Sequence, residues 1–342
     1  MADKTYLAPR GILGIHEPGG EHLLRNSKNG GWILFLHALG HDPYNVPAMD
    51  YTPWVDKGFG IIARLSHGYG TDGTIPLPGN YDAFAETVME HIRKSKGCGV
   101  FTIGNEMNHE QERPNKIPTT PAMYALCYAK CYKAAHSIPG SKNVQIALGP
   151  VGPYNDNTKY FGNETGDWIK YWTDCMDILH EVYKVDPDAL TLHAYTHGPE
   201  SRLVFSEDKM GAPFTNRRYH FRTYRDSMDA IPSWMRQVPV YITETNQYDA
   251  WTNANNAWVQ TAADEIDTWN SDRAHQQIRA LIIYRWPRYD KWAIDGKTRL
   301  YQDIEYAAGQ GNVWYPKDTD PEPNNIFRCP GCGRTMEVME VK

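Results

Sequence analysis

The sequence lacks a long apolar segment, an excess of basic residues and any low-complexity tract. No apolar run approaches the roughly 20 residues that cross a bilayer, so we expect no membrane-spanning helix. The formal net charge of −6 argues against a general nucleic-acid binder, because phosphate contacts require a basic surface. The 342 residues therefore predict a folded protein that binds neither membranes nor nucleic acid. Its oligomeric state stays open.

The N-terminal residues also lack the features of a secretory signal peptide. Met1 to Lys4 are followed by mixed polar and apolar residues, not by a basic segment and an apolar stretch. We therefore expect a cytoplasmic protein, with an extracellular location as the alternative if a signal was removed or export is non-standard. Without an export signal, the six cysteines are more typical of thiols or metal ligands than of a disulfide framework.

Metal-binding patterns are sparse. Cys329 and Cys332 form one Cys-x-x-Cys pair, which is half of a zinc ribbon, and no second pair supplies the four ligands that structural zinc usually takes. The pair is a candidate zinc site completed elsewhere in this or another chain, a redox-active pair, or a plain surface pair. Cys127 and Cys131 are predicted to be small core residues. A metal-dependent hydrolase is the least favoured function because no His-x-His motif occurs, and we expect catalysis without a cofactor.

Short β-rich runs alternate with helical patterns along most of the chain. This alternation predicts a (β/α)8 barrel over residues 1–315, followed by a linker and a short tail over residues 316–342. Residues 42–58 are rich in Pro and Gly and are expected to be irregular. The expected helices are 81–94, 121–136, 167–183 and 256–269. The eight expected strands are 11–17, 32–38, 60–66, 100–106, 144–149, 190–195, 240–244 and 280–286.

Two of the expected strands end in a glutamate flanked by small polar or amide residues, namely Glu106 and Glu244. A charged residue rarely follows an apolar run unless another group pairs with it or uses it. The two glutamates belong to the fourth and seventh strands, and the carboxyl ends of barrel strands form the catalytic face. Both carboxylates should therefore face one cleft, as an acid/base or nucleophile pair.

An Asn-Glu pair ending strand four and a glutamate ending strand seven resemble the retaining glycoside hydrolases of clan A. The resemblance implies that Glu106 is the general acid/base, that Glu244 is the nucleophile, and that Asn105 contacts the sugar 2-hydroxyl. It also implies that Tyr195 orients Glu244 and that Trp286 forms the floor beneath the sugar. The remaining candidate substrate-binding residues are His193, Arg64, His37 and Trp292.

The resemblance implies hydrolysis of an oligo- or polysaccharide by double displacement, and a glycan-binding barrel without catalysis is the alternative. A non-catalytic barrel would be expected to lose one glutamate, and this chain keeps both. Residues 217–225 are basic with interleaved aromatics, which predicts an amphipathic helix with a solvated basic face or, alternatively, a subsite for an acidic glycan. Aromatic residues that follow the strand ends are candidates to line the cleft: Tyr69, Tyr154, Tyr248, Trp251, Tyr289 and Trp292.

Overall fold

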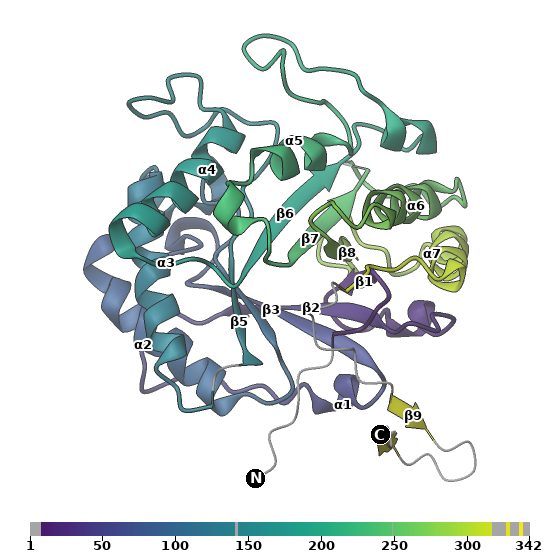
Figure 1. Cartoon of the computed structure of the whole chain (residues 1–342), viewed down its shortest axis with the longest axis horizontal. Coiled ribbons are helices and arrows are strands. Elements are labelled where there is room, and N and C mark those ends of the chain that lie inside the picture. Colours follow the sequence, from purple (N-terminus) through teal and green to yellow (C-terminus); the bar gives the residue numbers. More distant parts are fainter. Residues whose placement is uncertain (1–7, 141–142, 248, 317–325, 329–334, 338–342) are drawn as a thin grey trace.

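The eight predicted strands form a closed parallel barrel in sequence order. The computed structural model describes residues 8–140, 143–247, 249–316, 326–328 and 335–337. Helices surround the barrel (Figure 1), so the predicted (β/α)8 architecture is confirmed. The strands are β1 Leu13–His16, β2 Gly31–Ala38, β3 Phe59–Ser66, β4 Val100–Ile103, β5 Gln145–Leu148, β6 Ala189–Tyr195, β7 Val240–Asn246 and β8 Ile278–Ile283.

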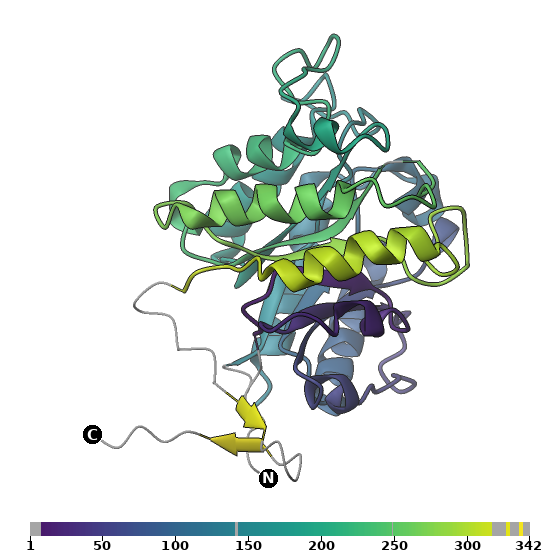
Figure 2. The same cartoon turned by 90° about the vertical axis from the view of Figure 1, so that its right-hand side faces the viewer.

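The outer helices agree closely with the sequence patterns. Helix α3 begins where predicted, because the Thr120 hydroxyl accepts a hydrogen bond from the Met123 amide and Pro121 occupies the first turn. The irregular segment after β2 contains only the four-residue helix α1. Figure 2 shows α6 and α7 lying side by side along the barrel. The helices are α1 Thr52–Val55, α2 Tyr81–Lys94, α3 Pro121–His136, α4 Trp168–Ile178, α5 Thr223–Ala230, α6 Trp258–Ser271 and α7 Thr298–Gln310.

Side-chain alternation divides the barrel interior into an apolar part and a polar mouth. Inward positions such as Trp32, Ile62 and Tyr241 form one buried cluster inside the barrel. Two residues beyond Ile62, Arg64 points to the same side, because successive side chains of a strand alternate between its faces. The same alternation along β6 gives His193 and Tyr195 a common direction. Strands that are apolar inside at one end therefore present polar groups at the other.

Strand β7 departs from this alternation at Glu244. Tyr241 belongs to the interior cluster, so regular alternation would place Thr243, not Glu244, on the interior face. The register between β6 and β7 shifts between Leu192 and His193, and His193 then pairs with Glu244. This β-bulge turns the Glu244 carboxylate into the barrel mouth. Bulges that re-aim one side chain are common beside active sites.

The prediction of a solvated basic helix over residues 217–225 is wrong. Helix α5 begins at Thr223, and the arginines around it are held by carboxylates instead of water. Arg222 and Arg225 both bind Glu265, whose side chain is only 1% exposed. Arg218 binds Asp226 and Glu207, and Arg217 binds Asp167. These ion pairs fasten the segment after β6 to α5, α6 and the N-terminus of α4, so the segment is structural.

Beyond residue 316 the structure describes only two short strands. Strands β9 (Ile326–Arg328) and β10 (Thr335–Glu337) pair antiparallel. Cys329 and Cys332 lie outside the described residues, so the zinc prediction stays a prediction. Cys127 and Cys131 are buried and free, which confirms that they are core residues. Across the residues that the structure describes, no helix has both the length and the apolarity to cross a bilayer.

Candidate active site

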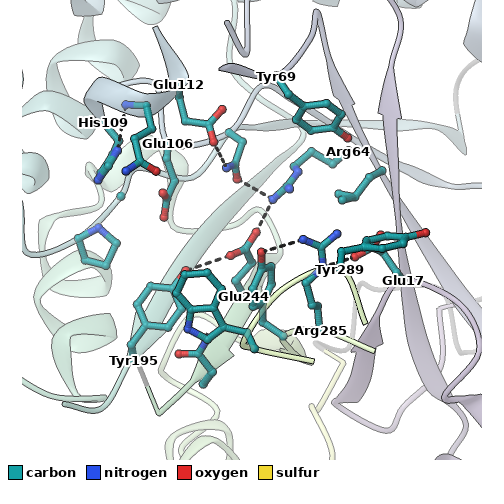
Figure 3. A pocket seen from close by; sticks show the side chains of 18 of the residues that line it. Glu17, Arg64, Tyr69, Glu106, His109, Glu112, Tyr195, Glu244, Arg285 and Tyr289 are labelled. Carbon is teal, nitrogen blue, oxygen red and sulfur yellow. Dashed lines mark hydrogen bonds and ion pairs between the residues drawn. The ribbon is translucent and has the colours of Figure 1, made fainter. Parts of the chain in front are cut away.

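A cavity of about 960 Å³ opens at the carboxyl ends of the barrel strands. Glu106 and Glu244 both line it (Figure 3). Its volume falls in the range of roughly 300–1,000 Å³ typical of small-molecule sites. Residues from the ends of β2, β3, β6 and β7 and from the loops that follow β1, β3, β4, β5, β7 and β8 form its wall. This is the face on which (β/α)8 barrels carry their active sites.

Glu244 is buried among donors and positive charge. Arg64 Nη1 donates a short hydrogen bond to Glu244 Oε1, and the Tyr195 hydroxyl donates to Oε2 at 3.1 Å. His16 Nε2 lies 3.4 Å from Oε1 on the β1 side. Burial alone would raise the pKa of Glu244, but the charges of His193 and Arg64 and the contact with His16 hold it well below the ordinary value. Glu244 is therefore an ionised, oriented carboxylate.

Asn105 is fixed beside the ion pair of Arg64 and Glu244. Arg64 Nη1 donates to Asn105 Oδ1 at 2.7 Å, which assigns the amide oxygen to the arginine side because a guanidinium can only donate. The amide nitrogen then points the other way, toward Glu112 Oε1 at 3.4 Å. The amide group of Asn105 is thus held at the cavity wall with its nitrogen as a donor.

Glu106 projects from a tight turn after β4. Its φ angle is +42°, its amide donates to the Pro150 carbonyl at 2.9 Å, and its side chain is 20% exposed. Gly152 packs against the carboxyl group: an added Cβ there would lie 3.1 Å from Glu106 Cδ. The turn therefore presents the carboxyl group to the cavity, and Gly152 leaves the space that the group occupies.

One imidazole lies between the two glutamates. His193 Nδ1 lies 2.8 Å from Glu106 Oε1, and its Nε2 lies 3.9 Å from Glu244 Oε1. The Tyr195 hydroxyl lies 3.1 Å from His193 Nδ1 and donates to Glu244. His193 is fully buried, so both contacts form away from water. The two carboxylates thus belong to one hydrogen-bonded cluster, with Glu244 the more buried member.

The opposite wall carries a second set of charges. Arg285 Nε donates to Glu17 Oε2 at 2.6 Å, and Arg285 Nη1 donates to Asp290 at 3.0 Å. Burial works against ionisation of Glu17, yet hydrogen bonds with His16 and Arg285 keep the pKa of Glu17 below its ordinary value. Figure 3 shows Glu17, Arg285 and Tyr289 together on the side of the cavity away from Glu106.

Glu112 is a third carboxylate near the glutamate pair, and no sequence pattern identified it. It lies in the loop after β4, six residues beyond Glu106, and lines the same cavity. Burial and, next, the negative charge of Glu106 raise the pKa of Glu112 to about 7, although Arg64 and Asn105 act in the opposite direction. Its signal was its position in a loop of the catalytic face, where functional residues gather.

The raised pKa of Glu112 makes stability depend on pH. A carboxyl group whose pKa is higher when folded stabilises the fold below its unfolded pKa of about 4.5, and that stability is lost as pH rises through about 7. Glutamine does not titrate, so Glu112→Gln should not show this loss. We expect its unfolding free energy to rise relative to that of the wild type by about 2 to 3 kcal/mol as pH increases from about 4 to about 8. Urea unfolding at both pH values measures the difference.

The matched control is Glu110→Gln, which removes an exposed carboxylate from the same loop. Its unfolding free energy should change equally at both pH values, by less than about 0.5 kcal/mol. If Glu112→Gln and wild type lose stability in parallel between the two pH values, Glu112 does not titrate as described.

Two predicted site residues lie elsewhere. His37 points away from the cavity: its Nε2 lies 2.6 Å from the Tyr51 hydroxyl, and burial beside His91 lowers its pKa to about 4. The neighbouring Leu36 lines the cavity instead, as alternation along β2 requires. The prediction that His37 lines the cavity is therefore wrong, because the inward position belongs to the residue before it.

Trp286 is not the floor of the cavity. It packs on the glycines that follow β1, where a Cβ added at Gly19 would lie 2.3 Å from the indole nitrogen, and its ring stacks on Tyr301 of α7. Strand β8 ends at Ile283, and Tyr284 takes the inward position beside His16, with ring centroids 4.7 Å apart. Tyr284 lines the cavity, so the aromatic residue at this end of β8 that reaches the cavity lies two residues before Trp286.

The aromatic residues after the strand ends divide into two groups. Tyr69, Tyr289 and Trp292 line the cavity. Tyr154 instead donates to the carbonyls of Tyr195 and His220, and Trp251 is buried with its indole donating to the Tyr284 carbonyl; Tyr248 lies outside the described residues. Nothing in the described ranges gathers three or more His, Cys, Asp or Glu side chains in a geometry that could hold a metal ion.

Comparison with known proteins supplies the fold but not a family. The sequence matches no protein-family profile and no curated protein. Similar solved structures include a glucosidase from Croceicoccus marinus (TM-score 0.56, 10% identity, 89% of this chain and 68% of that chain). They also include a family 44 endoglucanase produced by Clostridium acetobutylium (0.53, 12%, 91% and 78%) and a family 44 xyloglucanase of Paenibacillus polymyxa (0.52, 10%, 90% and 77%). At these identities the likeness concerns the barrel fold.

Proposed function

We propose that this protein is a retaining glycoside hydrolase in which Glu244 is the nucleophile and Glu106 the general acid/base. The observation that carries the proposal is the pairing of two unlike carboxyl groups in one cavity, joined through His193. Glu244 is buried and held ionised by Arg64 and the histidines, whereas Glu106 is partly exposed on the cavity wall. Glycoside hydrolysis needs one ionised and one protonated carboxyl group.

In the first step, a Glu244 oxygen attacks the anomeric carbon while the protonated Glu106 gives its proton to the glycosidic oxygen. The bond between the anomeric carbon and that oxygen breaks, and a covalent glycosyl ester with Glu244 forms. Arg64 and Tyr195 hold the attacking carboxylate in place, and the Asn105 amide nitrogen is a donor for a sugar hydroxyl. Preorganised donors of this kind stabilise charge where it develops.

In the second step, water attacks the anomeric carbon and Glu106, now ionised, takes its proton. The ester bond breaks, Glu244 leaves as a carboxylate, and the sugar product retains its anomeric configuration. Each glutamate returns to its starting state, so no cofactor is needed to balance the reaction.

The cavity favours a neutral glycan. Its carboxylates, Glu17, Glu106, Glu112, Glu244 and Asp249, outnumber its permanent cations, Arg64, Arg285 and Lys291. Arg285 and Lys291 are each paired with a carboxylate, so neither offers an unshared charge to an acidic sugar. The aromatic rings of Tyr69, Tyr289 and Trp292 supply flat apolar faces for sugar rings. The similar structures named above are a glucosidase, an endoglucanase and a xyloglucanase, which supports a glycan substrate.

The decisive experiment follows the anomer of the first-formed product by proton NMR. Wild-type protein is screened on 4-nitrophenyl β-glycosides, β-glucans, xyloglucan and xylan, with polygalacturonate as an acidic comparison. We expect hydrolysis of at least one neutral substrate and a β anomer that appears first. An α anomer appearing first contradicts Glu244 as nucleophile, and binding without hydrolysis indicates a non-catalytic barrel.

A further inference from the structure

A second cavity adjoins the catalytic one. It measures about 620 Å³ and lies between the loop after β3 and the loop after β4. Tyr69, Gln111 and Glu112 line both cavities, so the two form one groove that runs from Glu244 past Glu112. The residues that line only the second cavity are Gly70, Thr71, Glu110, Arg113 and Lys116.

The second cavity is built into the fold by contacts between its two loops. The Thr74 amide donates to the Glu112 carbonyl at 3.0 Å, and the Thr74 hydroxyl accepts from the Asn105 amide at 2.6 Å. Gly73 has a φ angle of +75°, and a Cβ there would lie 2.4 Å from the Pro114 nitrogen. Only glycine permits this close approach. The loops are thus fastened to each other and to the turn that carries Asn105 and Glu106.

The lining of this cavity suits sugar hydroxyls. Tyr69 is 53% exposed and lines both cavities, so its ring offers a face on which a sugar can stack. Glu110, Glu112, Arg113 and Lys116 all line this cavity, so acceptors and donors are both present and their formal charges balance. Arg113 Nη2 donates to the Thr158 hydroxyl and to the Asn157 carbonyl, which fixes the guanidinium at the cavity wall.

We propose that the second cavity is the continuation of the substrate cleft, and that it binds further sugar rings of a neutral glycan whose scissile bond lies at Glu106 and Glu244. The protein would then act on chains long enough to pass Tyr69 and Glu112, in preference to short glycosides. This proposal rests on the proposed function, since it needs a glycan in the catalytic cavity. Two connected cavities provide more length than one sugar ring requires.

The first test measures binding without hydrolysis. Glu244→Gln protein is titrated calorimetrically with cello-, laminari- and xylo-oligosaccharides of increasing length. For the series that wild type hydrolyses, we expect affinity to rise by at least about tenfold beyond the length that fills the catalytic cavity. Thr71→Trp in the same background fills the second cavity with a large side chain and should remove that rise; Thr71→Ser, which leaves the space open, should keep it.

The second test uses turnover. The ratio of kcat/KM on the long oligosaccharide to kcat/KM on the 4-nitrophenyl glycoside should fall about tenfold in Thr71→Trp and stay within about twofold of wild type in Thr71→Ser. Thr71 is exposed, and circular dichroism checks that each variant is folded. If aryl glycosides are hydrolysed but neither affinity nor this ratio depends on length or on Thr71, the second cavity is no subsite. If wild type hydrolyses no glycoside of any length, the proposed function itself fails.

Discussion

Glu244→Gln is expected to reduce kcat by about 10⁴-fold or more on every substrate that the wild type hydrolyses. The reason is that glutamine keeps the shape of the side chain but cannot form the glycosyl ester, and loss of a covalent nucleophile removes the whole double-displacement route. Because the glycosidic bond breaks in the same step in which Glu244 attacks the anomeric carbon, activated aryl glycosides should suffer as much as natural substrates. Release of 4-nitrophenol measures the loss.

A rescue experiment separates lost chemistry from lost folding. Glu244→Gly leaves an open space beside Arg64, and added azide can attack the anomeric carbon from the side that Glu244 faced. Glu106 would still protonate the leaving group, so we expect an α-glycosyl azide from a β-glycoside. A folded variant that gives no azide product, or gives the β azide, contradicts the assignment of Glu244. Glu86→Gln, an exposed substitution on α2, is the control for the loss of a glutamate outside the cavity.

Removal of the Glu244 charge also tests the electrostatics of the site. Arg64 is 7% exposed at its side chain, and its carboxylate partner is Glu244. Breaking a buried ion pair on one side typically costs about 3 to 5 kcal/mol, so Glu244→Gln should unfold at lower urea concentration than wild type. The rescue by azide remains informative because it needs only a folded fraction of the protein.

The barrel could be predicted because its determinants are local. Each strand is a short β-rich run. Helix α2 has an apolar periodicity, and α3 has a clear start signal in Thr120 and Pro121. Once eight strands are counted, the placement of Glu106 and Glu244 at one face follows from topology alone. Arg64, His193 and Tyr195 could be placed for the same reason, since each lies near the end of a regular strand.

The errors arose where a side chain's direction depends on a neighbour. His37 lies one residue from an inward position, and sequence alone does not settle the face of a strand buried on both sides. Trp286 was predicted from an extended β8, but the strand stops at Ile283 and Tyr284 becomes the inward aromatic. The bulge in β7 that turns Glu244 inward is a register shift between two strands, so no local pattern in either strand predicts it.

The basic segment and Glu112 show the same limit for charges. The arginines at 218, 222 and 225 have helical spacing, yet their partners Glu207 and Glu265 are far away in sequence. Glu112 lies in a loop with no periodicity, and its raised pKa comes from burial and from Glu106. Long-range pairing decides whether a charge is solvated, and that pairing exists only in the folded chain.

Glu106→Gln is expected to reduce kcat on an unactivated oligosaccharide by about 10² to 10⁴-fold, the range that general acid/base catalysis contributes. The loss should shrink for a 2,4-dinitrophenyl glycoside, because its leaving group needs no proton and the glycosyl ester on Glu244 still forms. Hydrolysis of that ester then lacks a base, so a burst of one equivalent of phenolate should precede slow turnover. Stopped-flow absorbance measures the burst.

Glu112 makes this burst experiment discriminating, because the cavity holds a second carboxyl group that could carry a proton near neutral pH. By pKa alone, Glu112 at about 7 would suit a general acid. Geometry favours Glu106, which lies 2.8 Å from the imidazole that also faces Glu244, whereas the Glu112 carboxylate is 3.4 Å from the Asn105 amide. We therefore expect Glu112→Gln to turn over without a burst and to keep the wild-type dependence on the leaving group. Position relative to the nucleophile decides which carboxyl group can reach the glycosidic oxygen. A burst in Glu112→Gln and none in Glu106→Gln would therefore assign the acid/base role to Glu112 instead of Glu106.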